Sequence, residues 1–140
     1  MAVTSESTTQ WHGTLTDGSG VVTLASGSGS FPVTWASRSG AAADTTTPEE
    51  LLGAAHSACF CMALSHALTG NGTPPESIAA TAAVTFQPGT GITGSHLLVS
   101  AKVPGLSAED FQRIADDAKA NCPVSQALAG VPITLEATLQ

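Results

Sequence analysis

Basic residues are scarce in this sequence. Lys and Arg together number four, against eleven Asp and Glu, which gives a formal net charge of −7. Nucleic acids and anionic membrane surfaces are bound through basic faces, because their phosphates attract Lys and Arg. The composition therefore argues against both classes of partner, and we expect the chain to bind neither nucleic acid nor a membrane.

Long hydrophobic runs are also missing. No stretch reaches the ~18 consecutive apolar residues that are typical of a membrane-spanning helix. The opening residues, MAVTSESTTQWHG, contain neither a basic start nor an apolar run, so they indicate no secretory signal. The expected compartment is therefore the cytoplasm.

Cysteine is rare, and its number is odd: the chain has three, Cys59, Cys61 and Cys122. Permanent disulfides are uncommon in the cytoplasm. An odd count is also a poor basis for a framework of structural disulfides. These thiols are therefore more typical of catalytic, redox or metal-binding roles.

The sequence has enough apolar material for a core, since 42% of its 140 residues are hydrophobic. Its length predicts one domain over residues 1–140. Gly-rich turns between short Val, Thr and Trp runs predict an antiparallel meander near the N-terminus. The expected order is three short strands within 10–35, a loop at 39–46, a long helix at 47–68, strands at 77–86 and 95–105, helices at 107–120 and after 123, and a closing strand at 131–139. This order predicts an α+β fold.

The strongest helix signal lies in TTPEELLGAAHSACFCMALS. Thr47 is the predicted N-cap, Pro48 the first helical residue and Glu50 the third. The apolar residues that follow nearly circle the helix axis, which is typical of a helix buried on most sides. A chain of this length has little material to wrap such a helix, so we expect a dimer that buries it against a second copy.

The three cysteines differ in position. Cys59 and Cys61 are two residues apart on the predicted helix, hence about 200° apart around it. They therefore cannot bond to each other or form a metal clip, and Cys61 is expected to be a small buried side chain. Cys122 precedes Pro123 at an apparent helix start, where the helix dipole favours a thiolate. Both a reactive role and a structural capping role fit Cys122.

A reactive Cys59 needs a cation from elsewhere in the fold, because it lies deep inside its own helix. The chain offers four candidates. Arg113 and Lys119 lie on a charged helix face, and Lys102 lies near a strand end, so all three are expected at the surface. Arg38, in the predicted loop before the long helix, is the remaining candidate.

His56 shares a helix face with Cys59, three residues away. That spacing would suit a pair of metal ligands or a Cys–His catalytic couple. No further ligand pair follows in the sequence, so we expect no metal and no cofactor. His56 is then predicted to be a hydrogen-bonded histidine in the core or an interface.

Two motifs, TTPEELLGAAHSACFCMALS and the later CPVSQAL, resemble those of the OsmC/Ohr family, the osmotically inducible and organic-hydroperoxide-resistance proteins. QWHGTL and VPITLEATL extend the resemblance over nearly the whole chain. The Arg38 segment and the close of the chain are more similar to the OsmC branch. The resemblance implies an OsmC/Ohr-like fold, with antiparallel strands around a long buried central helix. It also implies an intertwined homodimer with an active site at the subunit interface.

The same resemblance implies a thiol-dependent peroxidase that reduces organic hydroperoxides, and hydrogen peroxide less well, in oxidative and osmotic stress defence. Cys59 matches the cysteine that attacks the peroxide and becomes a sulfenic acid. Cys122 matches the resolving cysteine, which implies a Cys59–Cys122 disulfide reduced by an external dithiol, either dihydrolipoyl or thioredoxin-like. Glu49 matches the acid that pairs with the active-site arginine, and Arg38 fits that arginine. Cys61 lies where relatives often have another small residue and gains no role.

One point of geometry bears on this site. Glu49 and Cys59 are ten residues apart, or about 15 Å along a continuous helix. They cannot meet within one unbroken helix. If both act at one site, Glu49 is expected to come from the partner subunit.

Two other functions fit the same residues. A non-enzymatic redox sensor or binding protein could use Cys59 and Cys122 as a switch, and steady turnover with a reductant would exclude it. A small hydrolase could be built on Cys59 and His56, and turnover of activated esters without peroxide would support it.

Overall fold

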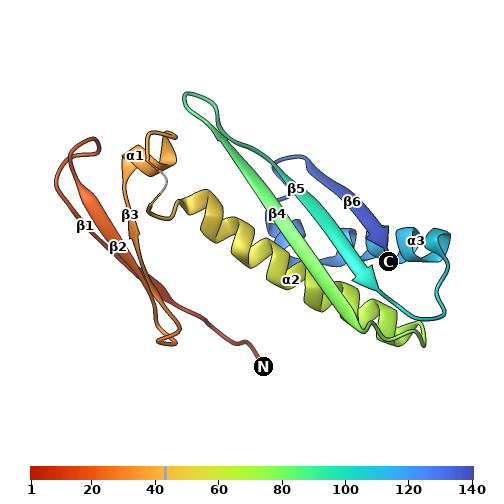
Figure 1. Ribbon diagram of the computed structural model, residues 1–140. Helices are drawn as coiled ribbons and strands as arrows, with labels where there is room; N and C mark the ends of the chain where they lie inside the picture. Colours follow the sequence, from red (N-terminus) through yellow and green to blue (C-terminus); the bar gives the residue numbers. More distant parts are fainter. Residues whose placement is uncertain (43) are drawn as a thin grey trace. The chain divides into compact units, whose positions relative to one another are not determined.

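The computed structural model describes residues 1–42 and 44–140, which form two compact units, Met1–Leu51 and Leu52–Gln140 (Figure 1). The N-terminal unit contains β1 (Ser7–His12), β2 (Ser19–Leu24), β3 (Ser30–Val33), α1 (Trp35–Arg38) and the start of α2 (Pro48–Gly70). The C-terminal unit contains the rest of α2, then β4 (Ser77–Gln87), β5 (Gly91–Lys102), α3 (Ala108–Asn121), α4 (Pro123–Ala127) and β6 (Ile133–Leu139). The predicted α+β class is confirmed.

The predicted meander is present in the N-terminal unit. Strands β1, β2 and β3 are neighbours in that order, and both pairs are antiparallel. The third strand is shorter than expected, because Thr34 leaves the strand and becomes the N-cap of α1. Its hydroxyl accepts a hydrogen bond from the Ser37 amide at 3.2 Å. Arg38 consequently lies at the end of a short helix, and the expectation that it lies in a loop is wrong.

The start of α2 follows the local signals. The Glu50 amide donates to the Thr47 hydroxyl at 3.0 Å, so Thr47 caps the helix as predicted. The Glu50 carboxylate accepts a hydrogen bond from the Thr46 hydroxyl at 2.9 Å. The helix runs to Gly70, slightly beyond the predicted end, and Gly72 follows with a positive φ of 82°.

Helix α2 is covered on one side within the C-terminal unit. Phe60, Leu64 and Leu68 are completely buried, whereas Ala58 is exposed and Met62 keeps 74% of its surface. The single chain therefore covers one side of α2, and the predicted burial on most sides depends on the expected second copy. An apolar stripe of α2 remains uncovered.

By length and composition alone, α2 could also span a membrane, with a mean hydropathy of 1.4 over an 18-residue window. A search for uninterrupted apolar runs misses it because Gly, Ser and His stand among its apolar residues. The core helix of a soluble protein passes the same test. Of that window, 28% is buried within the single chain.

The C-terminal sheet has the strand order β4, β5, β6. β4 and β5 are antiparallel, and Ala82 faces Leu97 in their register. β5 and β6 are parallel, with Leu97 facing Leu135. The antiparallel strands implied by the resemblance are found in the β4–β5 pair, whereas this edge of the sheet departs from that expectation. The chain returns to the sheet through α3 and α4, and such a crossover connection joins parallel neighbours.

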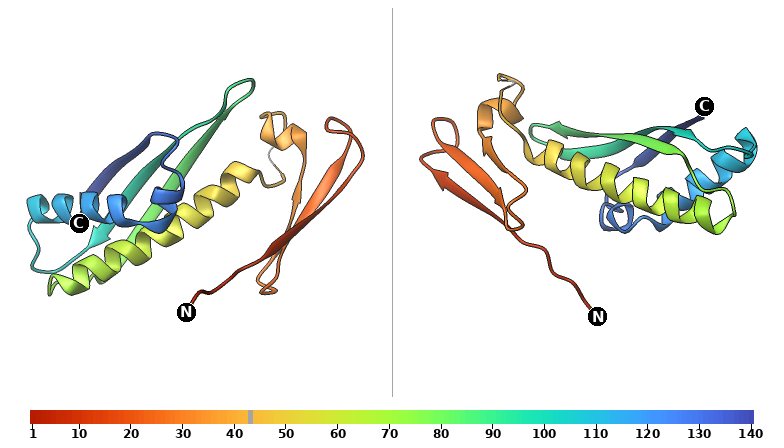
Figure 2. Two further views of the ribbon diagram at one scale, coloured as in Figure 1. Left: turned by 180° about the vertical axis from the view of Figure 1, so that it is seen from behind. Right: turned by 60° about the horizontal axis from the view of Figure 1, so that its bottom comes forward.

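Helices α2 and α3 cover the same face of this sheet (Figure 2). Alternate residues of β5, Leu97, Val99 and Ala101, point into the core between them. The apolar face of α3 is buried and consists of Phe111, Ile114, Ala115 and Ala118.

A glycine permits the close approach of α2 to β4. A Cβ atom on Gly53 would lie 2.7 Å from the carbonyl oxygen of Ala82. Only glycine fits at that distance without a backbone shift. This close packing holds the following turns of α2 against the sheet.

Candidate active site

Cys59 and Cys122 meet in the C-terminal unit. Cys59 projects from the middle of α2 and is half-buried, and Cys122 is completely buried at the N-cap of α4. The two thiols lie close enough for each to influence the pKa of the other. Both thiols are free in this structure. The fold thus brings together the two cysteines that the family resemblance pairs.

The two thiols differ in acidity. Burial raises the pKa of Cys59, and its hydrogen bond to Cys122 and the charge there raise it further, while the Val124 amide opposes the rise. Burial also acts to raise the pKa of Cys122. The Ser125 amide, the Cys59 thiol, the Ser125 side chain and the Val124 amide outweigh burial, so the pKa of Cys122 is lowered. Within this unit the negative charge is therefore more stable on Cys122.

The helix start at Cys122 is the predicted one, with Pro123 as the first residue of α4. The Cys122 side chain makes no capping hydrogen bond of regular geometry. The amides of Val124 and Ser125 nevertheless act on the sulfur and favour its anion. The first turn of α4 thus supplies the stabilisation that the sequence indicated.

A cavity of about 590 Å³ opens beside Cys59. Its wall is largely apolar and comes from α2, α3 and the start of α4. The lining includes Met62, Ala63, Ala67, Ala118 and Pro123, with His66, Asp117 and Asn121 as its polar members. The cavity can hold a small apolar molecule in contact with the Cys59 sulfur.

Arg38 and Glu49 form an ion pair in the N-terminal unit. Arg38 Nη2 lies 2.8 Å and Nε 3.1 Å from the same carboxylate oxygen, Glu49 Oε1. The Glu49 side chain is 7% exposed and the Arg38 side chain 32%. A planar guanidinium held at two nitrogens has a fixed orientation, which suits it to an anionic or polar oxygen. The pairing of these two residues implied by the resemblance is present.

The thiol pair and the ion pair belong to different units of the chain. Helix α2 is continuous from Pro48 to Gly70. Glu49 and Cys59 are therefore separated by ten residues of helical rise, about 15 Å. They make no direct contact through that helix.

His56 is a fully buried, hydrogen-bonded histidine, as predicted. Its Nδ1 lies 2.7 Å from the Ser95 hydroxyl and its Nε2 lies 2.8 Å from the Ser125 hydroxyl. Burial lowers the pKa of His56. Because serines occupy both ring nitrogens, the Cys–His couple that a hydrolase would need is not formed with Cys59.

Ser95 and Ser125 are members of this cluster that the sequence alone did not reveal. Ser125 stands three residues after Cys122, the spacing at which a helix residue faces its own N-cap. That spacing within CPVSQAL is a local signal. Ser95 is 39 residues from His56 and carries no such signal.

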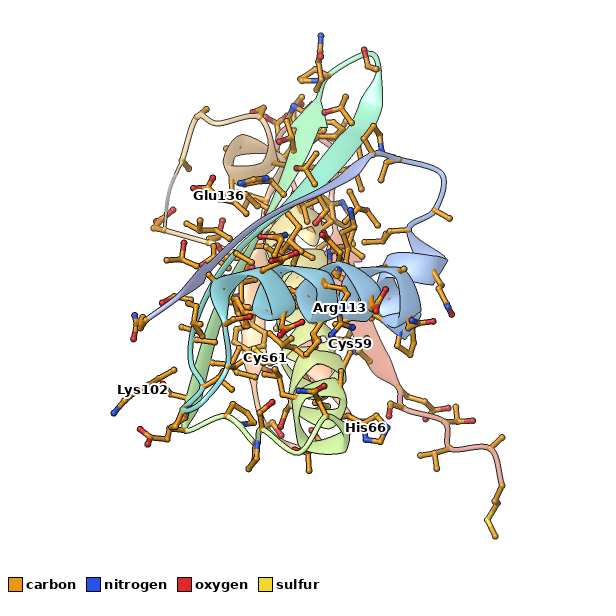
Figure 3. The ribbon with its side chains drawn as sticks, turned by 90° about the vertical axis from the view of Figure 1, so that its right-hand side faces the viewer. Cys59, Cys61, His66, Lys102, Arg113 and Glu136 are labelled. Atoms are coloured by element: carbon orange, nitrogen blue, oxygen red, sulfur yellow. The ribbon has the colours of Figure 1, made fainter. Side chains whose placement is uncertain are left out.

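The remaining thiol and cations lie apart from the pair. Cys61 leaves α2 on a different side from Cys59 (Figure 3) and interacts with the backbone of Ala80, and burial raises its pKa. The side chains of Lys102 and Arg113 are largely exposed and pair with acids, Glu76 at 2.6 Å and Asp110 at 3.3 Å. In residues 1–42 and 44–140, no three His, Cys, Asp or Glu side chains are grouped to hold a metal ion.

Comparison with known proteins gives a consistent result. Residues 41–136 match the family described as OsmC-like protein. Peroxiredoxin OsmC of Escherichia coli (strain K12) is 38% identical over 148 aligned residues, covering 100% of this chain and 99% of that protein.

Solved structures share the fold. An organic hydroperoxide resistance protein from Elizabethkingia anophelis superposes with a TM-score of 0.72 at 26% identity, covering 100% of this chain and 97% of that one. An OsmC-like protein from Mycoplasma pneumoniae gives 0.75 at 15% identity, with 99% of each chain covered. The full-length identity and the family match lead to one conclusion: this chain belongs to the OsmC family.

Proposed function

We propose that this OsmC-family peroxidase reduces organic hydroperoxides to alcohols through a Cys59 sulfenic acid and a Cys59–Cys122 disulfide. The chain is a peroxidase by its full-length similarity to Peroxiredoxin OsmC. One observation carries the finer proposal. A thiol beside a largely apolar cavity of about 590 Å³ touches a second, buried thiol.

In the first step the Cys59 thiolate attacks one peroxide oxygen. The O–O bond breaks, the alkoxide leaves and takes up a proton, and Cys59 becomes a sulfenic acid. Burial raises the pKa of Cys59, so this thiolate needs a cation. Arg38, held by Glu49, supplies it and also stabilises the charge that develops on the leaving oxygen.

In the second step Cys122 attacks the Cys59 sulfur, and the disulfide forms with release of water. An external dithiol, dihydrolipoyl or thioredoxin-like, then reduces the disulfide. The cavity accounts for a preference for alkyl peroxides, because its exposed wall is mostly apolar and includes three alanines and Met62. Hydrogen peroxide has no alkyl group to bind against that apolar wall.

We further propose a cytoplasmic homodimer. The uncovered stripe of α2, which includes Ala54, Ala58 and the largely exposed Met62, supports an interface with a second copy. Burying this stripe would complete the coverage that the single chain lacks.

The test is peroxide consumption with cumene, tert-butyl and hydrogen peroxides, each with dihydrolipoamide or reduced thioredoxin. Continuous turnover is expected, with a higher kcat/KM for the two alkyl peroxides. Oxidation that stops after one equivalent with every dithiol would instead support the redox-switch function. Turnover of activated esters without peroxide would support the hydrolase.

A matched pair of variants separates the two steps. Cys59→Ser is expected to abolish peroxide reduction. Cys122→Ser is expected to reduce one equivalent rapidly and then stall, with Cys59 advancing to sulfinic acid under excess peroxide. Undiminished steady-state turnover of Cys122→Ser with the same dithiol would show that Cys122 does not resolve the sulfenic acid.

A further inference from the structure

His56 is a buried titratable group that the two-cysteine mechanism leaves unused. It has no exposed surface, and its ring nitrogens lie 2.7 Å from Ser95 Oγ and 2.8 Å from Ser125 Oγ. Burial lowers the pKa of His56, so the ring is neutral near pH 7. A neutral imidazole has one N–H donor and one acceptor nitrogen. Of its two hydrogen bonds, one is therefore donated by the ring and the other is accepted by it.

Ser125 sets that direction because it touches both His56 and Cys122. Its hydroxyl carries a single proton. Ser125 is the third residue of the helix that Cys122 caps, and its side chain acts on the Cys122 sulfur to lower the pKa of the thiol. A hydroxyl has this effect when its proton points at the sulfur. The Ser125 oxygen must then accept from His56 Nε2–H, and His56 Nδ1 must accept from the Ser95 hydroxyl.

We infer that His56 is a positioning residue for the resolving cysteine: its Nε2–H holds the Ser125 hydroxyl in the orientation that donates to the Cys122 sulfur. The inference rests on the proposed function, in which Cys122 attacks the Cys59 sulfenic acid. In the opposite orientation Ser125 would give its proton to His56. Its lone pairs would then face the sulfur and disfavour the thiolate.

The step in question is balanced without another reactant. The Cys122 thiolate attacks the Cys59 sulfur, the S–O bond of the sulfenic acid breaks and the S–S bond forms. The oxygen leaves as water, carrying the proton that Cys122 lost. A donated hydrogen bond enlarges the thiolate fraction more than it reduces the nucleophilicity of each thiolate, so it accelerates the attack.

The size of the effect follows from two general values. A hydrogen bond to a charged group shifts an equilibrium by about tenfold or more. About half of such a change in thiol acidity is carried into the rate of attack, on a logarithmic scale. Loss of the Ser125 hydroxyl should therefore slow disulfide formation by about threefold to tenfold.

The experiment follows one turnover of the full-length reduced protein. Protein is mixed with one equivalent of cumene hydroperoxide and quenched, and mass spectrometry with dimedone trapping counts Cys59 sulfenic acid and Cys59–Cys122 disulfide. In Ser125→Ala, disulfide formation is expected to slow by about threefold to tenfold. The rate of sulfenic acid formation is expected to stay unchanged. Ser57→Ala is the matched control, since the hydroxyl of this α2 serine donates to the Ala54 carbonyl and lies outside the chain of hydrogen bonds. It should leave both rates unchanged.

Two substitutions at His56 test its own part. A glutamine amide reaches the position of Nε2, whereas the shorter asparagine reaches only that of Nδ1. His56→Gln should retain most of the disulfide rate, and His56→Asn should lose as much as Ser125→Ala. The double variant His56→Asn/Ser125→Ala should be no slower than Ser125→Ala, because His56 acts through Ser125.

A second readout is the Cys122 thiol itself. In a Cys59→Ser, Cys61→Ala background, Cys122 titrates alone with a hydroxyl donor still beside it. Ser125→Ala should raise the pKa of Cys122, measured by thiolate absorbance. If His56 and Ser125 had a purely structural role, their substitution would lower thermal stability without shifting the Cys122 titration. The titration also tests the inference if His56→Asn does not fold.

The outcomes are distinguishable. If the unsubstituted protein never forms a Cys59 sulfenic acid, the proposed function fails. If it forms the disulfide and Ser125→Ala forms it equally fast with an unchanged Cys122 titration, the inference is overturned and the peroxidase mechanism stands. Additive effects of His56→Asn and Ser125→Ala would remove the positioning role of His56 alone.

Discussion

At the scale of residues, the two chemically important thiols differ in what surrounds them. Cys122 is completely buried, and the first turn of α4 stabilises its anion. Cys59 borders a cavity, and burial raises its pKa. In the proposed mechanism, the thiol that meets peroxide is thus accessible but weakly acidic, and its partner is more acidic but enclosed. This division suits an attacking thiol that depends on an arginine and a resolving thiol shielded from peroxide.

The first residue-scale prediction concerns disulfide pairing. Treatment with peroxide should yield an intramolecular Cys59–Cys122 disulfide with Cys61 still free, because Cys59 and Cys122 are in contact and Cys61 faces the backbone of Ala80. Peptide mapping after alkylation of free thiols measures the pairing. Recovery of Cys61 in the oxidant-induced bond would contradict it.

A second prediction concerns pH and His56. Burial lowers the pKa of His56 in the folded state, so the unfolded chain binds more protons between the two pKa values. The stabilisation is complete above the unfolded pKa of about 6.5 and is lost as pH falls towards the folded pKa. The free energy of unfolding should therefore fall by up to about 1.4 kcal/mol per pH unit below that point.

Urea denaturation between pH 7.5 and 5 measures this slope. His56→Gln removes the titrating group and should flatten the slope, while Ser57→Ala should keep it. An equal slope in His56→Gln and the unsubstituted protein would show that other groups cause the acid sensitivity.

At the scale of elements, α2 has two faces with different duties. One face, with Phe60, Leu64 and Leu68, packs against the sheet and α3, while Met62 lines the cavity from a largely exposed position. The same helix therefore forms core on one side and a wall of the candidate substrate site on another. Apolar residues around the helix axis supply both the core packing and the cavity wall.

The element-scale prediction separates these faces. Leu64→Ala should lower the free energy of unfolding by about 2–5 kcal/mol, because it leaves a cavity in a closed part of the core. Thr69→Ala, at an exposed position of the same helix, should change it by less than about 0.5 kcal/mol. Urea denaturation of both variants provides the comparison, and similar losses for the two would refute the one-sided packing of α2.

At the scale of the whole molecule, the proposed mechanism depends on which chain supplies the arginine. The thiol pair and the Arg38–Glu49 pair lie in different units of the chain. A homodimer could therefore assemble each active site from two subunits. Ten residues of continuous helix between Glu49 and Cys59 favour that arrangement.

Mixing two inactive variants tests it. If Arg38 acts across the interface, Cys59→Ser chains mixed with Arg38→Ala chains should regain activity, because each heterodimer has one site with both Cys59 and a partner Arg38. If Arg38 acts within its own chain, every site lacks one of the two. A mixture that stays inactive despite demonstrated subunit exchange would reject the cross-subunit role, and a monomer at working concentration would reject the shared site.

The sequence by itself determined the features that depend on near neighbours. The cap at Thr47, the helix start after Cys122 and the N-terminal meander involve residues close together in the chain, so local sequence patterns predict them. Motif resemblance added the pairing of Cys59 with Cys122 and of Arg38 with Glu49. The short helix α1 was missed because four residues carry no periodicity.

Tertiary structure decided the rest. The parallel pairing of β5 with β6 depends on a crossover through two helices. The covered and uncovered sides of α2 depend on which elements pack against it. The hydrogen bonds of His56 span 39 residues to Ser95 and 69 to Ser125. No local propensity encodes such contacts, because they arise only when packing brings distant segments together and leaves a buried polar group to be satisfied.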